Sequence, residues 1–269
     1  MIIASNGSGL GNRIKAIISC LRLSPDAKVV WPKVPGVFCC EFSDLFTNNM
    51  EADYSPYSRR YDSWRMIVLD TDPIPDGFSI VTKDVDRIGR KFSHTDPRGR
   101  NIDLEYQRIP KSVLKDCVEK LNTLKINETV LKWVKEYEDV FDDKTISVHI
   151  RSWEDQDPDE ESELRQKHFF NLNNFIDEMM SYDEDTKFFV CSDSLNVIGK
   201  LKKLFGDRII TYKRHSDLKT SRSTRVGAQD DLAEMLLLSK NKIIVGSYIS
   251  TFTEMAWYFG GAKAKVIIC

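Results

Sequence analysis

The chain has 269 residues, 41% of them hydrophobic, which is enough for the core of one large or two medium globular domains and excludes a disordered chain. Its 39 basic and 41 acidic residues leave a formal net charge of −2, so the overall charge does not favour nucleic acid or an anionic membrane as a partner. Any anionic ligand must therefore be held by a local cluster of side chains.

Signals for export, membrane insertion and metal binding are not found in the sequence. There is no basic region followed by a long apolar run at the beginning, and no later stretch is long and uncharged enough to span a bilayer. We therefore expect a soluble, cytoplasmic protein. The six cysteines lack the paired spacing of a zinc site, and most of them are predicted to be reduced packing residues. No set of carboxylates and histidines has metal-ligand spacing, so we expect neither a metal nor a cofactor.

The amino terminus predicts a strand, a glycine-rich turn and a helix. Residues 1–4 form a short apolar run, the sequence SNGSGLGNR follows, and apolar residues then recur at helical spacing. Gly9 and Gly11 allow the backbone to approach a ligand closely, and the free amides at a helix start favour negative charge. The alternative is that these glycines only form the turn, because the sequence is neither a Walker A loop nor a clear dinucleotide fingerprint.

The next hundred residues contain fewer clear elements. Residues 29–31 predict a second strand, and aromatic and basic residues are interleaved between 47 and 108. Such side chains can stack on sugars, although an insertion packed by its own aromatics is the favoured interpretation. Amphipathic helices are predicted near 110–121 and over 127–141. We place a domain boundary between them, which gives an amino-terminal Rossmann-like domain (1–125), expected on the acceptor side, and a carboxyl-terminal one (126–269).

The stretch ISVHIRSWEDQD, residues 146–157, predicts a strand that ends in charged residues and opens into an acidic loop. Alternation places His149 and Arg151 on one face of this strand. Arg151 offers a planar fork of donors that matches phosphate oxygens, and His149 can donate or accept one hydrogen bond. Alternatively, Arg151 pairs with a nearby carboxylate and His149 is a half-buried strand residue. Glu154, Asp155 and Asp157 are candidates for a base or an acceptor contact, or are solvated loop charges.

The remaining chain alternates regularly between strands and helices. This order predicts a parallel sheet with helices on both faces, and in such sheets ligands lie outside the carboxyl ends of the strands. The predicted strands are 187–191, 208–211, 242–245 and 265–268, and the predicted helices are 169–180, 195–205, 229–239 and 252–259.

Three groups of residues follow these strands. Ser192 and Asp193 either cap the next helix or contact a ribose hydroxyl or a base amine. The turn 246–253 places hydroxyls at a helix start, which makes it a second anion site, a helix N-cap, or both. A basic connection around Arg214 is either a solvated loop or a segment that closes over a diphosphate.

Four motifs in this order resemble the GDP-fucose-dependent fucosyltransferase superfamily, which includes the nodulation and core α1,6-, the α1,2- and the protein O-fucosyltransferases. They are SGLGNR, VHIR before an acidic segment, FFVCSDS, and DDLAEMLLLSKNKIIVGSYISTFTEMAWYFGG. The resemblance does not cover residues 47–108. It implies a GT-B fold, in which two Rossmann-like domains face a cleft, and inverting, metal-independent transfer from GDP-β-L-fucose to a glycan hydroxyl. The missing luminal anchor fits a bacterial or viral enzyme.

The resemblance also implies roles for individual residues. Arg151 matches the arginine at the donor diphosphate, His149 its partner, and Asn12 the asparagine near the reacting sugar. With Glu154 as the candidate base, the expected catalytic residues are Arg151, Asn12 and Glu154. The expected substrate-binding residues are Gly9, Gly11, Asn12, Arg13, His149, Arg151, Ser192, Asp193, Ser247, Ser250, Thr251 and Phe252.

One departure from the family leaves the linkage open. Several relatives have a second arginine and then Gly-Asp, where this chain has Ser152-Trp153-Glu154. Two alternatives remain at this point: the same fold with another nucleotide-sugar donor, or a module that binds a nucleotide or glycan without turnover. The oligomeric state is not predicted.

Overall fold

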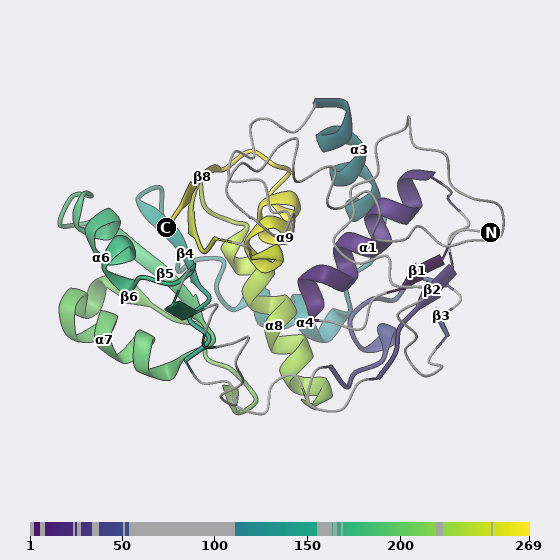
Figure 1. The fold of residues 1–269 in the computed structure, drawn as a ribbon, viewed down its shortest axis with the longest axis horizontal. Coiled ribbons are helices and arrows are strands. Elements are labelled where there is room, and N and C mark those ends of the chain that lie inside the picture. Colours follow the sequence, from purple (N-terminus) through teal and green to yellow (C-terminus); the bar gives the residue numbers. More distant parts are fainter. Residues whose placement is uncertain are drawn as a thin grey trace.

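The computed structural model describes residues 3–5, 9–23, 25, 28–33, 38–50, 52–53, 111–154, 163, 166–167, 169–218, 223–248 and 250–269. Most of the aromatic and basic segment, Asp155 and Asp157 lie outside these residues. In the described part, two parallel sheets lie at opposite ends, with helices between them (Figure 1).

The amino-terminal sheet has three parallel strands in the order β1 (Ile3–Ser5), β2 (Lys28–Val30) and β3 (Ala52–Asp53). Helix α1 (Leu10–Leu23) connects β1 to β2, as the strand, turn and helix prediction required. Five apolar residues at helical spacing are buried, which explains why this segment folds as a helix against the core. These positions are Leu10, Ile14, Ile17, Ile18 and Leu21. The two-residue strand β3 was not predicted.

The carboxyl-terminal sheet has five parallel strands in the order β6-β5-β4-β7-β8. Their bounds are β4 (Thr145–Ile150), β5 (Lys187–Ser192), β6 (Ile209–Ile210), β7 (Ile243–Gly246) and β8 (Lys265–Ile268). The chain runs outward from β4 through β5 to β6, and then returns to place β7 on the other side of β4. The carboxyl ends of β4 and β7 therefore form the topological switch point, where ligands bind in open parallel sheets.

Helices cover both faces of this sheet, as the sequence predicted. Strand β4 is buried along its whole length, and its aliphatic residues Ile146 and Val148 share one core with α6 (Leu172–Met180) and α7 (Leu195–Phe205). Ser147 points the other way and donates to the Leu238 carbonyl of α8 (Arg225–Leu238) at 2.7 Å. Helix α9 (Thr251–Phe259) packs beside α8 on that face.

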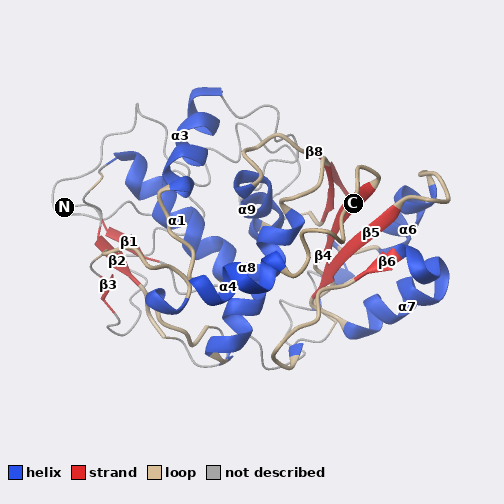
Figure 2. Ribbon diagram, turned by 180° about the vertical axis from the view of Figure 1, so that it is seen from behind, coloured by secondary structure: helices blue, strands red, loops and turns tan. Residues whose placement is uncertain are grey.

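The helical layer between the two sheets belongs to one hydrophobic core. Helix α1 contacts both α8 and α9, while α3 (Lys111–Asn122) packs on α1 and α4 (Glu128–Lys135) packs on α8. Views from opposite sides place α1, α8 and α9 between the sheets (Figures 1 and 2). The core therefore continues across the predicted boundary near residue 125.

Several predicted helix bounds were wrong because capping residues, rather than apolar spacing, set the ends. Helix α6 begins after Asn171, whose side chain accepts from the Asn173 amide, and not at residue 169. Helix α8 begins after Thr224, four residues before the predicted start, because the Thr224 hydroxyl accepts from the Gly227 amide. Helix α4 ends at Lys135, and turns occupy residues 136–140.

Two further expectations concern the membrane and the cysteines. Within the described ranges, no helix combines the length and the apolar character needed to cross a membrane. All six cysteines are free thiols. Four of them are buried, in agreement with the prediction of packing residues: Cys20, Cys40, Cys117 and Cys191.

Candidate functional site

The carboxyl ends of β4, β5 and β7 bring three predicted site residues together. These strands are parallel neighbours, so the residues that follow them lie at one edge of the sheet. The Arg151 amide donates to Ser247 Oγ at 2.7 Å, and Arg151 Nη1 donates to Asp193 Oδ2 at 2.6 Å. Ser247 Oγ in turn donates to the His149 carbonyl at 3.2 Å. The side chains of Arg151 and Asp193 are 16% and 18% exposed, so the pair is reachable from solvent.

The Asp193 carboxylate also binds the backbone of the loop after Arg151. Oδ1 accepts from the Ser152 amide at 2.7 Å and from Ser152 Oγ at 3.1 Å, while Oδ2 accepts from the Trp153 amide at 3.1 Å. Trp153 has a φ of 57°, a left-handed conformation that is unusual for a bulky residue. The Arg151 guanidinium carbon lies 5.5 Å from the centre of the Trp153 ring.

His149 is buried beneath this group. Its Nδ1 lies 2.8 Å from Thr253 Oγ1 and 3.4 Å from Ser250 Oγ, and its ring stacks on Phe252 with centroids 4.8 Å apart. Burial lowers the pKa of His149 to about 4, with Asp193 opposing and Arg151 adding to this shift. The imidazole is therefore neutral near pH 7, and it offers the site a hydrogen bond rather than a charge.

The starts of α1 and α9 meet, although they are far apart in the sequence. Ser250, in the turn 246–253 where an N-cap was one interpretation, is the N-cap of α9 and accepts from the Thr253 amide. A Cβ atom on Gly11 would lie 2.8 Å from the Thr251 carbonyl carbon and oxygen and 2.9 Å from the Phe252 nitrogen. Gly11 is thus required by the close contact between two helices, and two positive helix ends converge at this point.

The other residues of the glycine-rich turn differ in their surroundings. Asn12 is half-buried, and its Oδ1 atom is enclosed without a hydrogen-bond partner among the residues that the structure describes. Arg13 is 1% exposed, its guanidinium lies over the Trp31 and Phe38 rings at 4.9 and 4.6 Å, and Nη2 donates to the Pro32 carbonyl. The Arg13 side chain is therefore enclosed by the amino-terminal core. A Cβ atom on Gly9 would meet nothing within 4 Å.

Glu154, the predicted base, contacts the start of α7. Its Oε2 atom accepts from Ser194 Oγ at 3.1 Å and from Asn196 Nδ2 at 3.2 Å, and Lys200 Nζ lies 4.0 Å from Oε1. Ser194 is the N-cap of α7, and its amide donates to Ser192 Oγ. The start of α7 is therefore capped by Ser194, and not by Ser192 or Asp193, the two residues that the sequence suggested as caps.

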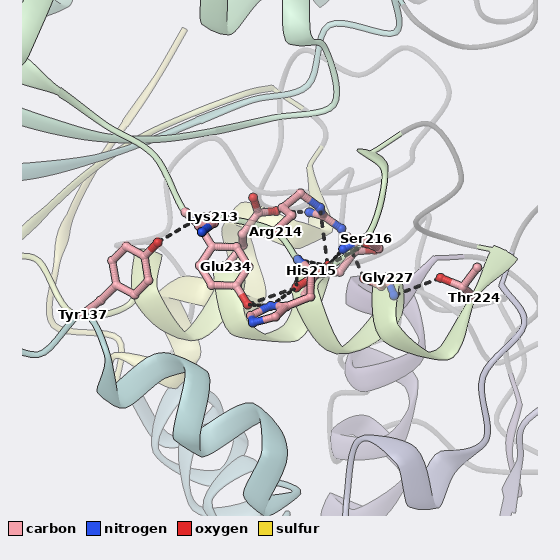
Figure 3. A network of polar contacts seen from close by, with 11 residues as sticks. Tyr137, Lys213, Arg214, His215, Ser216, Thr224, Gly227 and Glu234 are labelled. Atoms are coloured by element: carbon pink, nitrogen blue, oxygen red, sulfur yellow. Dashed lines mark hydrogen bonds and ion pairs between the residues drawn. The ribbon is translucent and has the colours of Figure 1, made fainter.

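Arg214, in the basic connection after β6, pairs with acidic residues of α8 (Figure 3). Arg214 Nη1 lies 2.5 Å from Glu234 Oε2, and its Nη2 lies 2.6 Å from Asp231 Oδ1. Asp230 is fully buried and accepts from Tyr212 and from the His215 and Ser216 amides. Burial raises the pKa of Glu234 to about 7, and Arg214 opposes the shift. Arg214 thus has structural partners.

Sequence reasoning missed the contribution of Trp153 to the site, and it included Thr253 in the turn 246–253 without giving it a role of its own. A left-handed φ at Trp153 has no signal in the sequence, because tertiary hydrogen bonds hold it. The i, i+4 spacing of Asp230 and Glu234 would have indicated an acidic face on α8. No cluster of three or more potential metal ligands occurs in the part of the chain that was described.

Solved fucosyltransferases have a similar fold. NodZ α-1,6-fucosyltransferase co-crystallized with GDP is 18% identical, with 95% of this chain and 90% of that chain covered at a TM-score of 0.53. The fucosyltransferase NodZ from Bradyrhizobium is 18% identical, with coverages of 95% and 91% and a TM-score of 0.54. POFUT1 in complex with GDP is 11% identical, with coverages of 100% and 97% and a TM-score of 0.50.

No protein-family model and no curated protein matches the chain at a significant level. The resemblance to fucosyltransferases is confirmed as a similarity of fold over nearly the whole chain. At 11–18% identity the likeness concerns the fold alone, so the activity has to be argued from the site.

Proposed function

We propose that this chain is a GT-B-like glycosyltransferase that transfers L-fucose from GDP-β-L-fucose to a glycan hydroxyl, with inversion and without a metal. Its two Rossmann-like units are residues 1–125 and 126–269. The observation that carries the proposal is Arg151, fixed at the β4–β7 switch point between Asp193 and the Ser247 hydroxyl. The order of the four motifs and the shared fold support the choice of donor.

In this proposal the donor diphosphate lies against Arg151 and the start of α9. As the bond between the sugar C1 and the β-phosphate oxygen breaks, its electron pair leaves with GDP and the sugar becomes oxocarbenium-like. A guanidinium held by neighbouring groups, together with the amides of a helix start, stabilises this developing charge without reorganising. Neutral His149 and the hydroxyls of Ser250 and Thr251 add hydrogen bonds rather than charge.

The acceptor hydroxyl attacks C1 from the opposite face and forms the new bond as its proton leaves. Asn12, at the start of α1, has a buried Oδ1 atom that can accept from a sugar hydroxyl. We assign the proton to Glu154, whose carboxylate would first have to exchange its bonds with Ser194 and Asn196.

A non-catalytic binding module is the second candidate. The observation that favours it is the short contact between Arg151 and Asp193, because an arginine that serves only as a structural ion pair would look the same. Another nucleotide sugar in place of GDP-fucose is a variant of the first proposal.

Release of GDP from GDP-fucose, in parallel with other nucleotide sugars, separates these candidates. A fucosyltransferase is expected to release GDP from GDP-fucose in preference to the other donors, and to do so equally in excess chelator, since Arg151 and helix amides supply the positive charge. Binding of GDP without any release would favour the module. Preference for another donor would change the substrate, and activity restored only by added manganese would contradict the metal-independent reaction.

A further inference from the structure

Four donors to the Asp193 carboxylate come from three consecutive residues of one loop, Arg151, Ser152 and Trp153. Oδ1 accepts from the Ser152 amide and hydroxyl, and Oδ2 accepts from Arg151 Nη1 and the Trp153 amide. An ionised carboxylate has about four lone-pair sites, and this loop supplies four donors. A ribose hydroxyl or a base amine would have to displace one of them in order to bind Asp193.

Asp193 holds Trp153 in an unfavourable backbone conformation. Trp153 has a φ of 57°, and a bulky L-residue occupies this region only where its surroundings enforce it. The amide of this same residue donates to Asp193, its side chain is 6% exposed, and Arg151 lies over its ring. The loop therefore turns back so that carboxylate and indole both contact the guanidinium.

We propose that Asp193 is a positioning residue, which fixes Arg151 and the turn at 152–153 before the donor binds and does not contact the nucleotide. This inference rests on the proposed function of the site, because Arg151 acts on the diphosphate only in that reaction. It replaces the expectation that Asp193 binds the ribose or the base. Preorganisation of this kind makes Arg151 effective, since a guanidinium that needs no reorientation stabilises charge as it develops.

The first experiment measures amide hydrogen exchange at Ser152 and Trp153 without ligand. In Asp193→Asn the amide side chain has one acceptor oxygen in place of two, so we expect exchange at least tenfold faster at one or both amides. The matched control is Asp143→Asn, because Asp143 is 89% exposed and pairs with Lys242 on the surface. Unchanged protection of both amides in Asp193→Asn would overturn the proposal.

The second experiment compares the binding of GDP and guanosine. If Asp193 acts through Arg151, Asp193→Asn should weaken GDP binding about tenfold or more and leave guanosine binding unchanged. In a protein that already carries Arg151→Ala, Asp193→Asn should have little further effect on GDP binding, because both changes remove the same interaction between Arg151 and Asp193. Equal losses for GDP and guanosine, or additive losses in the double variant, would show a direct nucleotide contact and overturn the proposal.

A third measurement uses the unmodified protein, so it tests the proposal even if Asp193→Asn does not fold. Added GDP should maintain or increase amide protection at Ser152 and Trp153, whereas a nucleotide that takes Asp193 would lower it. If the unmodified protein binds no GDP, the proposed function fails. The ligand-free exchange experiment still decides whether Asp193 holds the turn.

Discussion

Arg151 combines two properties that a transferase needs at one side chain, a charge that is permanent and a geometry that is set in advance. Arg151→Lys retains the charge but loses the planar fork, so the contacts to Asp193 and a phosphate cannot both be kept. We expect turnover of GDP-fucose to fall by about 10²–10³-fold, roughly 3–4 kcal/mol, and Arg151→Ala to lose at least as much. Turnover and melting temperature are measured on the same preparations.

Arg208→Lys is the matched control for this change. Arg208 precedes β6, at the opposite edge of the sheet, and donates to the carbonyls of Thr186 and Asp183. The Arg208→Lys variant should therefore retain turnover of GDP-fucose. Near-normal turnover in Arg151→Lys would instead assign Arg151 to a structural ion pair.

His149 predicts a pH dependence of stability. Its pKa is about 4 in the folded protein and ordinarily 6.5, so the unfolded chain binds more protons between these values. The His149 contribution to stability is complete above about pH 6.5 and is lost as the pH falls from 6.5 to 4, by about 3 kcal/mol in total. In His149→Gln this loss should be absent from the free energy of unfolding measured by urea between pH 7 and 4.

The comparison of variants matters because Glu234 acts in the opposite direction. Its raised pKa means that the folded state binds more protons than the unfolded chain. The Glu234 contribution to the free energy of unfolding therefore falls as the pH rises from about 4.5 to 7. The two slopes partly cancel in the parent protein. An identical pH dependence in His149→Gln and the parent would contradict a buried, neutral His149.

At the scale of elements, the contact between α1 and α9 depends on Gly11. In Gly11→Ala the new methyl group meets Thr251 backbone atoms at 2.8 Å, and backbone cannot rotate away as a side chain can. We expect a loss of about 1–3 kcal/mol in the free energy of unfolding, as for other overpacked sites. Weaker GDP binding should accompany it, because the start of α9 is displaced.

Gly199→Ala in α7 is the matched control for Gly11→Ala. A Cβ atom there would meet nothing within 4 Å, so only the helix preference for alanine remains, and we expect a gain of up to about 1 kcal/mol. Urea unfolding should show a decrease in the free energy of unfolding for Gly11→Ala and an increase for Gly199→Ala. Equal effects at Gly11 and Gly199 would show that the helices separate easily at this contact.

At the scale of the whole molecule, a buried ion pair joins the two halves. Lys15 Nζ in α1 lies 2.7 Å from Glu254 Oε2 in α9, and the side chains are 4% and 3% exposed. Burial raises the pKa of Glu254, and Lys15 opposes the shift. Lys15→Met would leave a carboxylate buried without its partner, so we expect a loss of about 3–5 kcal/mol, most of it recovered in Lys15→Met/Glu254→Leu.

Calorimetry is the measurement that tests this prediction. Because one core crosses the layer between the sheets, the heat-absorption peak should remain single and move as a whole in Lys15→Met. A peak that splits into two would show that residues 1–125 and 126–269 unfold independently. If Lys15→Met were as stable as the parent protein, the ion pair between Lys15 and Glu254 would not join the two halves.

The sequence by itself determined those features that depend on local periodicity and on residues close in the chain. The helical spacing in α7 and the apolar run of β8 gave bounds that the structure reproduces. An N-cap in the turn 246–253 could be predicted because an N-cap residue bonds an amide only two or three residues away, as Ser250 does. The alternation of strands and helices also predicted a parallel sheet covered on both faces, and hence the edge at which Arg151, Asp193 and Ser247 meet.

Only the tertiary structure decided which distant residues touch. Arg214 was interpreted either as part of a solvated loop or as part of a segment that closes over a diphosphate, whereas its partners Asp231 and Glu234 lie 17 and 20 residues further along the chain. Gly11 was read as a ligand-binding glycine, and the structure adds its contact with Thr251. The left-handed turn at Trp153 persists because Asp193, 40 residues away, accepts its amide. Local sequence patterns do not contain these contacts between distant residues. The contacts form, and stabilise the protein, only after folding has brought the strands side by side.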